Sequence, residues 1–257
     1  MPDAAVLTLQ VASEHIPEVL PKPKGEKHPL GPLKVVHAFW LAAGGSILAA
    51  QHALTERVAF NIGGGFHHAF PDHGEGFCMI HDVAVAIRRL QADGALQRVL
   101  VVDTDVHQGN GTAAIFAGDE SVFTLSLHQE NNYPDPKPPS DLDVNLADGV
   151  GDEQYLELLD KALAEAFRRF APQMLFYIGG ADPYRDDQLG GLLLTMQGLQ
   201  ERDALVFAEA RLRGLPVAVA FAGGYARQVE DTVGIHVNTV IAARECAAAR
   251  LRQGIDA

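Results

Sequence analysis

Residues 98 to 111, RVLVVDTDVHQGNG, carry the clearest structural signal in the chain. The apolar run before Asp103 shows no polar alternation, which is typical of a strand buried on both faces of a parallel sheet. Two aspartates and a histidine follow at every second position, and Gly109 and Gly111 flank Asn110. The pattern predicts a buried strand over 98–105, a polar strand end, and a short helix ending near Phe116.

Similar apolar runs and helical patterns alternate on both sides of this stretch. We expect further strands at 57–62, 121–128, 173–180 and 216–224, and helices at 39–54, 79–94, 152–170, 195–214 and 233–253. Residues 131–141 form a proline-rich loop, and 5–12 is a short strand or a frayed helix. Residues 16–32 contain five prolines and are expected to form an irregular arm. The alternation predicts an α/β fold with an open, mainly parallel sheet and helices on both faces.

Composition narrows the class of protein. The chain has 257 residues, 47% of them hydrophobic and 21% charged, and neither a repeat nor a linker divides it, so we expect one domain. The net charge of −13 disfavours nucleic acid and anionic membranes as direct partners. Only two cysteines are present, and no apolar run approaches 18 residues. We therefore expect a cytoplasmic protein of unknown oligomeric state.

Polar residues and glycines follow all five expected strands. Because the carboxyl ends of parallel strands meet at one edge of a sheet, we expect these residues to converge on a ligand site there. In chain order they are Gly63, Gly64, Gly65, His67 and His68; Asp103, Asp105 and His107; Ser126 and His128; Gly179, Gly180 and Asp182; and Gly223, Gly224 and Tyr225.

The spacing at the end of strand 98–105 suggests a metal site. Asp103, Asp105 and His107 would lie on one face of an extended segment, where neighbouring carboxylates need a cation to neutralise them. With Asp182 as a third ligand, Asp105 and His107 would give the open pattern of a catalytic zinc. The alternative is an ordinary solvated strand end. The adjacent pair of His67 and His68 would need an irregular backbone to share one site.

Five motifs together resemble the zinc-dependent histone deacetylase superfamily. They are GGGFHHAFPDHGEGFC, VDTDVHQGNGT, SLHQENNYP, GGADPYRDDQLGGLLLT and AGGY, and they stand in the order found in that superfamily. Asn110, GFC and SDLDVNLADGVGDEQYL look most like class IV and its bacterial relatives. The resemblance runs from about residue 34 to about 243. It implies the three-layer α/β/α fold of arginases and deacetylases, with the active site at the carboxyl ends of the strands.

The resemblance also implies roles for individual residues. Asp105, His107 and Asp182 match the zinc ligands, with iron(II) as an alternative metal. His67 and His68 match the tandem acid/base histidines, Asp103 and Asn110 match their respective partners, and Tyr225 matches the tyrosine that donates to the oxyanion. Phe77, Tyr133, Leu189 and Gly76 match substrate-binding positions around an acyl-lysine tunnel. Asp103, Asp105, His107, Ser126 and Leu127 match a structural potassium site.

The implied activity is removal of an acetyl or longer acyl group from lysine side chains of a peptide or protein, or from a small acylated amine. An arginase-type ureohydrolase with two manganese ions is the second candidate, but Gln108 and Asn110 stand where further charged ligands would be wanted. The third candidate is an inactive acyl-lysine binding protein. This candidate is kept because relatives have a longer N-terminal region, which residues 1–33 do not match well. We therefore expect this arm to be atypical or truncated.

Overall fold

The fold is a six-stranded open sheet in which every pair of neighbouring strands is parallel. The computed structural model describes residues 31–253, so the element expected at 5–12 and nearly all of the arm lie outside the described residues. The strands follow the order β1-β6-β5-β2-β3-β4 across the sheet. They are β1 (Val58–Asn61), β2 (Val99–Asp103), β3 (Val122–Gln129), β4 (Leu142–Leu146), β5 (Met174–Ile178) and β6 (Val217–Ala220).

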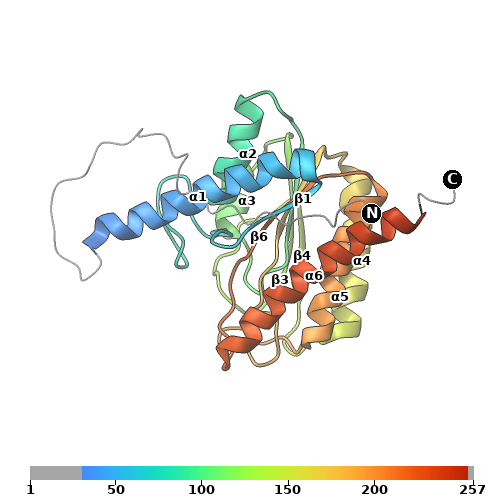
Figure 1. The fold of residues 1–257 in the computed structure, drawn as a ribbon. Coiled ribbons are helices and arrows are strands. Elements are labelled where there is room, and N and C mark those ends of the chain that lie inside the picture. The colour runs from blue at the N-terminus through green and yellow to red at the C-terminus, as the bar shows by residue number, and fades with distance from the viewer. Residues whose placement is uncertain (1–30, 254–257) are drawn as a thin grey trace.

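Helices cover both faces of the sheet, so the molecule has three layers (Figure 1). One face carries α1 (Gly31–Glu56), α2 (Asp82–Ala92) and α3 (Asn110–Phe116). The other carries α4 (Asp152–Arg169), α5 (Met196–Leu212) and α6 (Val229–Gln253). The predicted fold class is confirmed.

The central strands supply the core to both layers. Every residue of β2 is buried, with Leu100 and Val102 in the cluster beneath α4 and α5, and Val99 and Val101 in the cluster beneath α2. This two-sided burial explains why the sequence of β2 shows no polar alternation. The strand ends at Asp103, where the side chains turn from apolar to acidic.

Three elements differ from the predictions. The strand β4 was missed because its sequence, LDVNL, is half-polar and only Leu146 is fully buried, as suits an edge strand. Helix α1 begins at Gly31 rather than near 39, and Pro32 is compatible with a first helical turn, where its missing N–H costs nothing. Helix α6 begins four residues earlier than predicted because its first turn is acidic, with Glu230 and Asp231.

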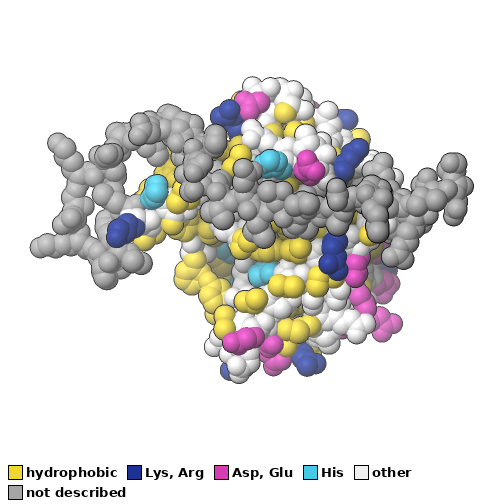
Figure 2. Space-filling view, in the orientation of Figure 1, with side chains coloured by type: hydrophobic (Ala, Val, Ile, Leu, Met, Phe, Trp, Pro, Cys, Tyr) yellow, Lys and Arg dark blue, Asp and Glu magenta, His cyan; other side chains and the backbone are white. Residues whose placement is uncertain are grey.

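The surface of the described chain combines polar and apolar regions. Hydrophobic side chains gather on the face over which α6 runs (Figure 2), where α6 exposes Val229, Val233 and Val237. Among residues 31–253, no helix is both long and apolar enough to cross a membrane.

Candidate active site

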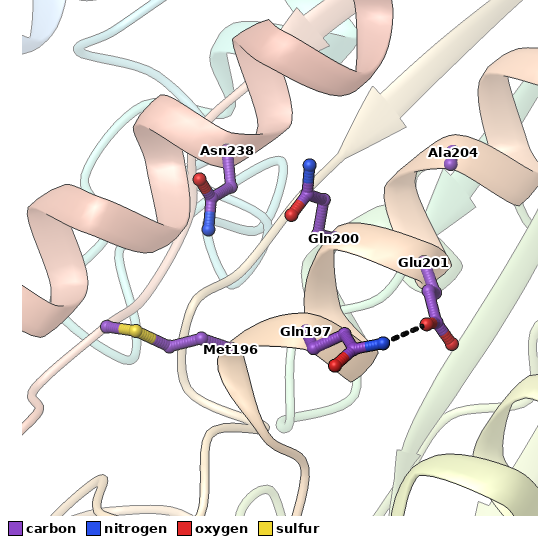
Figure 3. A pocket seen from close by; sticks show the side chains of 6 residues that line it. All are labelled: Met196, Gln197, Gln200, Glu201, Ala204 and Asn238. Atoms are coloured by element: carbon purple, nitrogen blue, oxygen red, sulfur yellow. Dashed lines mark hydrogen bonds between the residues drawn. The ribbon is translucent and has the colours of Figure 1, made fainter.

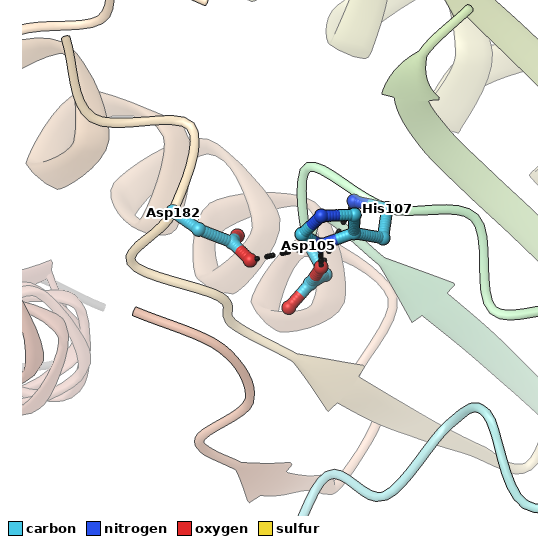
Figure 4. A group of neighbouring side chains, drawn as sticks. All are labelled: Asp105, His107 and Asp182. Carbon is cyan, nitrogen blue, oxygen red and sulfur yellow. Dashed lines mark hydrogen bonds and ion pairs between the residues drawn. The ribbon is translucent and has the colours of Figure 1, made fainter. Parts of the chain in front are cut away.

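Three side chains from two strand ends form a compact cluster that could hold a metal ion. Asp105 and His107 follow β2, and Asp182 follows β5 (Figure 4). One ligand atom from each residue lies within 4.8 Å of the other two. The Nδ1 atom of His107 is 3.1 Å from Asp105 Oδ1 and 3.3 Å from Asp182 Oδ2. Asp182 Oδ2 is buried, and among the described residues its one ion-pair partner within 4.0 Å is a ligand candidate, His107, so this oxygen can serve a cation.

Backbone N–H groups hold the carboxylates of Asp105 and Asp182 in place. Val106 N donates to Asp182 Oδ1 at 2.9 Å, and Gly223 N, after β6, donates to Asp105 Oδ2 at 2.9 Å. A Cβ atom on Gly223 would lie 2.4 Å from Asp182 Oδ2, so this close approach requires glycine. Strand β2 ends at Asp103, and the chain bends over residues 105–107 instead of continuing as the expected extended segment. This bend brings the His107 imidazole next to the Asp105 carboxylate.

The charges in this cluster favour a bound cation. Burial opposes protonation of His107, but the hydrogen bonds and charges of Asp105 and Asp182 outweigh it and raise its pKa to about 10. Burial, together with the charge of Asp105, raises the pKa of Asp182 to about 7. Two buried carboxylates that draw a proton onto a neighbouring imidazole would be neutralised equally well by a divalent ion. The donor set therefore fits a metal.

The histidine pair lies beside this cluster, and each imidazole has its own partner. His67 Nδ1 is 2.7 Å from Asp103 Oδ2, and His68 Nδ1 is 2.7 Å from Asn110 Oδ1. Burial lowers the pKa of His67, but the charges of Asp103 and Asp105 prevail and raise it to about 9. Burial and the charge of His67 lower the pKa of His68 to about 3. The two neighbours thus have opposite protonation preferences.

The glycine run gives the chain the irregular path that this pair needs. Gly65 has a φ of +94°, and the backbone N–H groups of Gly65 and Phe66 donate to the Asp82 carboxylate at the start of α2. Ser46 of α1 also donates to Asp82. A side chain at Gly64 would collide with Asp82 Oδ2 at 2.3 Å. Asp82 therefore ties the loop that carries both histidines to two helices.

Exposed side chains, most of them aromatic, lie beside the histidine pair and form a rim, made of Phe77, Tyr133, Tyr225 and Leu189. The rings of Tyr133 and His68 are 4.9 Å apart between centroids, and those of Phe77 and Tyr225 are 6.3 Å apart. Phe77 is 82% exposed and has a φ of +66°, an uncommon backbone conformation for a non-glycine residue. Leu189 is also exposed at this rim, and its carbonyl accepts from Asn132.

The remaining predicted residues also lie near the cluster. Asp103 of β2 pairs in register with Ser126 of β3, and Leu127 follows it in the core. Ser126 Oγ is 2.9 Å from His128 Nδ1. The potassium site that these residues would form stays a prediction.

Sequence reasoning missed several supporting residues. Asp82 ties down the histidine loop, and Asp187 accepts from the backbone N–H groups of Tyr225, Leu189 and Gly190. His81 caps α2 by accepting a hydrogen bond from Ala84 N at 3.1 Å. An aspartate or histidine directly before a helical pattern is the signal that could have found the caps.

A surface hollow of about 560 Å³ lies away from this cluster, between α5 and α6 (Figure 3). It is lined by Met196, Gln197, Gln200, Glu201, Ala204 and Asn238. None of these residues belongs to the predicted site. Gln197 and Glu201 hydrogen-bond to each other across one turn of α5.

The family model of the histone deacetylase domain matches residues 11–240. The chain belongs to the histone deacetylase family. The resemblance expected from the motifs is thereby confirmed.

Individual relatives agree with this assignment. The chain is 45% identical over 211 residues to an uncharacterized protein of Picosynechococcus sp., covering 82% of this chain and 70% of the relative. It is 36% identical over 207 residues to histone deacetylase 2 of Arabidopsis thaliana, covering 78% of this chain and 54% of that one. Acetylpolyamine aminohydrolase from Burkholderia pseudomallei has a similar structure, with a TM-score of 0.70, 29% identity, and coverage of 80% of this chain and 62% of that chain. The chain thus spans only about half to two thirds of the length of several relatives.

Proposed function

We propose that the protein is a metal-dependent hydrolase that removes an acyl group from lysine side chains or from a related acylated amine. The observation that carries this proposal is the cluster of Asp105, His107 and Asp182 beside two imidazoles with opposite pKa shifts. Membership of the histone deacetylase family supports the reaction class. The likeness to an acetylpolyamine aminohydrolase supports an acylated amine as the substrate class.

Asp105, His107 and Asp182 would hold the metal, which we propose to be zinc, with iron(II) as the alternative. When bound, the ion would supply Lewis-acid chemistry, polarising the acyl carbonyl and activating water for attack. Such a mixed set of carboxylate and imidazole ligands also accepts other divalent ions, so the metal has to be identified by analysis.

The chain's own residues would handle the protons and the developing charge. His68 is neutral in its surroundings, so its imidazole can take a proton from the attacking water and later deliver it to the leaving amine. His67, paired with Asp103, would add positive charge beside the reacting carbonyl. The hydroxyl of Tyr225 would donate a hydrogen bond to the carbonyl oxygen as it becomes negative.

The rim would hold the substrate. Phe77 and Tyr133 present exposed aromatic faces that can pack along the apolar stem of an acylated lysine. Gly76 would let the loop that carries Phe77 approach His68 closely, because glycine places no side chain between the loop and the His68 ring. Leu189 would add an apolar contact at the same edge.

Metal analysis combined with acetate release from an acetyl-lysine peptide and from an acetylated polyamine tests this proposal. One metal per chain and turnover that falls at least a hundredfold in Tyr225→Phe would support it. Two manganese ions per chain with urea release would favour the ureohydrolase. Metal binding without hydrolysis of any acyl amide, across several acyl lengths, would favour the binding protein.

A further inference from the structure

Glu75 lies at the entrance of the site and joins two of its residues. Its Oε1 atom accepts a hydrogen bond from Asn110 Nδ2 at 2.8 Å and another from the hydroxyl of Tyr133. Its backbone is fixed by a tight turn, in which Glu75 N donates to Cys78 O at 2.9 Å and Cys78 N donates to Glu75 O at 2.7 Å. The carboxylate is therefore held in place although its side chain is 34% exposed.

This contact and the backbone N–H of Gly111 together determine which way the Asn110 amide points. An asparagine amide has an acceptor end and a donor end of nearly the same shape, so its neighbours decide its orientation. A carboxylate only accepts, and it therefore takes the Nδ2 end. The Oδ1 end is then left facing His68 Nδ1 at 2.7 Å and the backbone N–H of Gly111 at 3.1 Å.

The orientation of Asn110 in turn sets the tautomer of His68. Because Oδ1 can only accept, the neutral imidazole must carry its proton on Nδ1 and leave its lone pair on Nε2. We propose that Glu75 is a positioning residue that holds His68, through Asn110, in the tautomer able to accept a proton at Nε2. This proposal rests on the proposed function, in which His68 takes the proton of the attacking water.

The charge of Glu75 gives the arrangement a second effect. Asparagine at 110 cannot stabilise a protonated His68 as a carboxylate would, and Glu75 places a negative charge directly behind the amide. The hydrogen bond from Tyr133 is the largest influence on the Glu75 carboxyl and lowers its pKa, which keeps it ionised at neutral pH. The imidazolium formed during proton transfer is thereby stabilised across one intervening amide.

The tautomer can be measured without turnover. In zinc-loaded protein at pH 7.5, ¹⁵N NMR of the His68 ring should show the Nδ1–H form alone in wild type. Glu75→Gln should keep it, because the introduced amide oxygen still accepts from Asn110. Glu75→Ala should give a mixture of both tautomers. Glu120→Ala is the matched control, because Glu120 is an exposed glutamate with no side-chain hydrogen bond or ion pair to the described residues, and it should leave the spectrum unchanged.

Exchanging the charges of Glu75 and Asn110 separates positioning from general packing. Asn110→Asp alone places two carboxylates in contact and should lower kcat at least tenfold. Adding Glu75→Gln should recover most of that loss, because the introduced amide nitrogen can donate one hydrogen bond to the introduced carboxylate and a second to the hydroxyl oxygen of Tyr133. Glu75→Ala should lower kcat about tenfold with KM changed less than threefold.

Failure of this proposal and failure of the proposed function give different results. An unchanged tautomer in Glu75→Ala, or a double variant no better than Asn110→Asp, would overturn the role of Glu75. Should wild type hydrolyse no acyl amide while the tautomer still responds to Glu75→Ala, the proposed function fails and the positioning of His68 stands.

Discussion

Gly76 and Phe77 form a tight turn that brings the backbone against the His68 ring. Both have positive φ angles, +51° and +66°, and a Cβ atom on Gly76 would lie 2.4 Å from His68 Cδ2. The resemblance to deacetylases pointed to both positions, but the residue pattern alone could not show that one of them must lack a side chain. That requirement depends on a contact between residues eight positions apart in an irregular loop.

We predict that Gly76→Ala damages activity more than stability. The positive φ costs about 1 kcal/mol of unfolding free energy for an alanine, and the new methyl group must also displace His68. The kcat for an acyl-lysine peptide should fall at least tenfold. Gly118 has a φ of +74° with no atom within 4 Å of its added Cβ, so Gly118→Ala should lose similar stability and keep full activity. Equal kcat values in the two variants would refute the contact.

The loop after β1 shows how helices position residues that a strand alone cannot. Asp82 begins α2, is fully buried, and accepts from Gly65 N, Phe66 N and Ser46 Oγ. The sequence indicated that three glycines would free the chain from the sheet. It did not indicate what holds the freed loop, because the partner lies on the next helix and bonds to backbone groups, which leave no trace in the residue pattern.

Asp82→Ala should therefore destabilise the protein and release the histidine loop. The backbone N–H groups of Gly65, which is buried, and of Phe66, which is partly buried, would lose their acceptor, at a cost of about 3 kcal/mol in unfolding free energy. Ser46→Ala removes one donor and leaves both backbone bonds, so about 1 kcal/mol is expected. Urea unfolding of both variants checks the difference. Similar losses in the two would mean that Asp82 does not anchor the loop.

Across the whole molecule, the ends of β1, β2, β5 and β6 bring together residues that are up to about 160 positions apart, from Gly63 to Gly224. Continuous apolar runs predicted the parallel sheet, and the parallel sheet predicted the shared edge, so fold class and the convergence of the site could be derived from sequence. The edge strand β4 could not be predicted, because an edge strand is only partly buried and its sequence therefore lacks a continuous apolar run. Three carboxylates accept the hydrogen bonds that hold the site in place: Asp82, Asp187 and Glu75. Acidic residues usually lie on the surface, so their roles could not be predicted without the tertiary contacts.

A partly buried histidine of α6, His236, gives the fold a predictable response to pH. His236 stacks on Phe221 with 4.3 Å between ring centroids, and its Nδ1 is buried without a hydrogen bond. Burial, with the charge of Arg202, lowers its pKa to about 4. Between pH 6.5 and 4 the unfolded chain binds a proton here that the folded chain does not, so the histidine's contribution to stability is lost as pH falls.

His236→Phe should remove that contribution while keeping the ring stack. Urea unfolding in the presence of a chelator should show wild type losing up to about 1 kcal/mol more per pH unit than the variant between pH 6.5 and 4. Comparing the two proteins cancels the titration of the groups that they share. Parallel curves across this window would show that His236 can be protonated without unfolding.

The proposed chemistry depends on a single metal centre formed by residues at two strand ends. Anomalous X-ray diffraction at the zinc edge, on crystals of zinc-loaded protein, tests it most directly. We expect one strong peak per chain in contact with Asp105, His107 and Asp182, and no peak at that position in crystals of Asp182→Ala. Two peaks about 3.5–4 Å apart would indicate a two-metal centre, and a peak in contact with other residues would show that Asp105, His107 and Asp182 do not hold the metal.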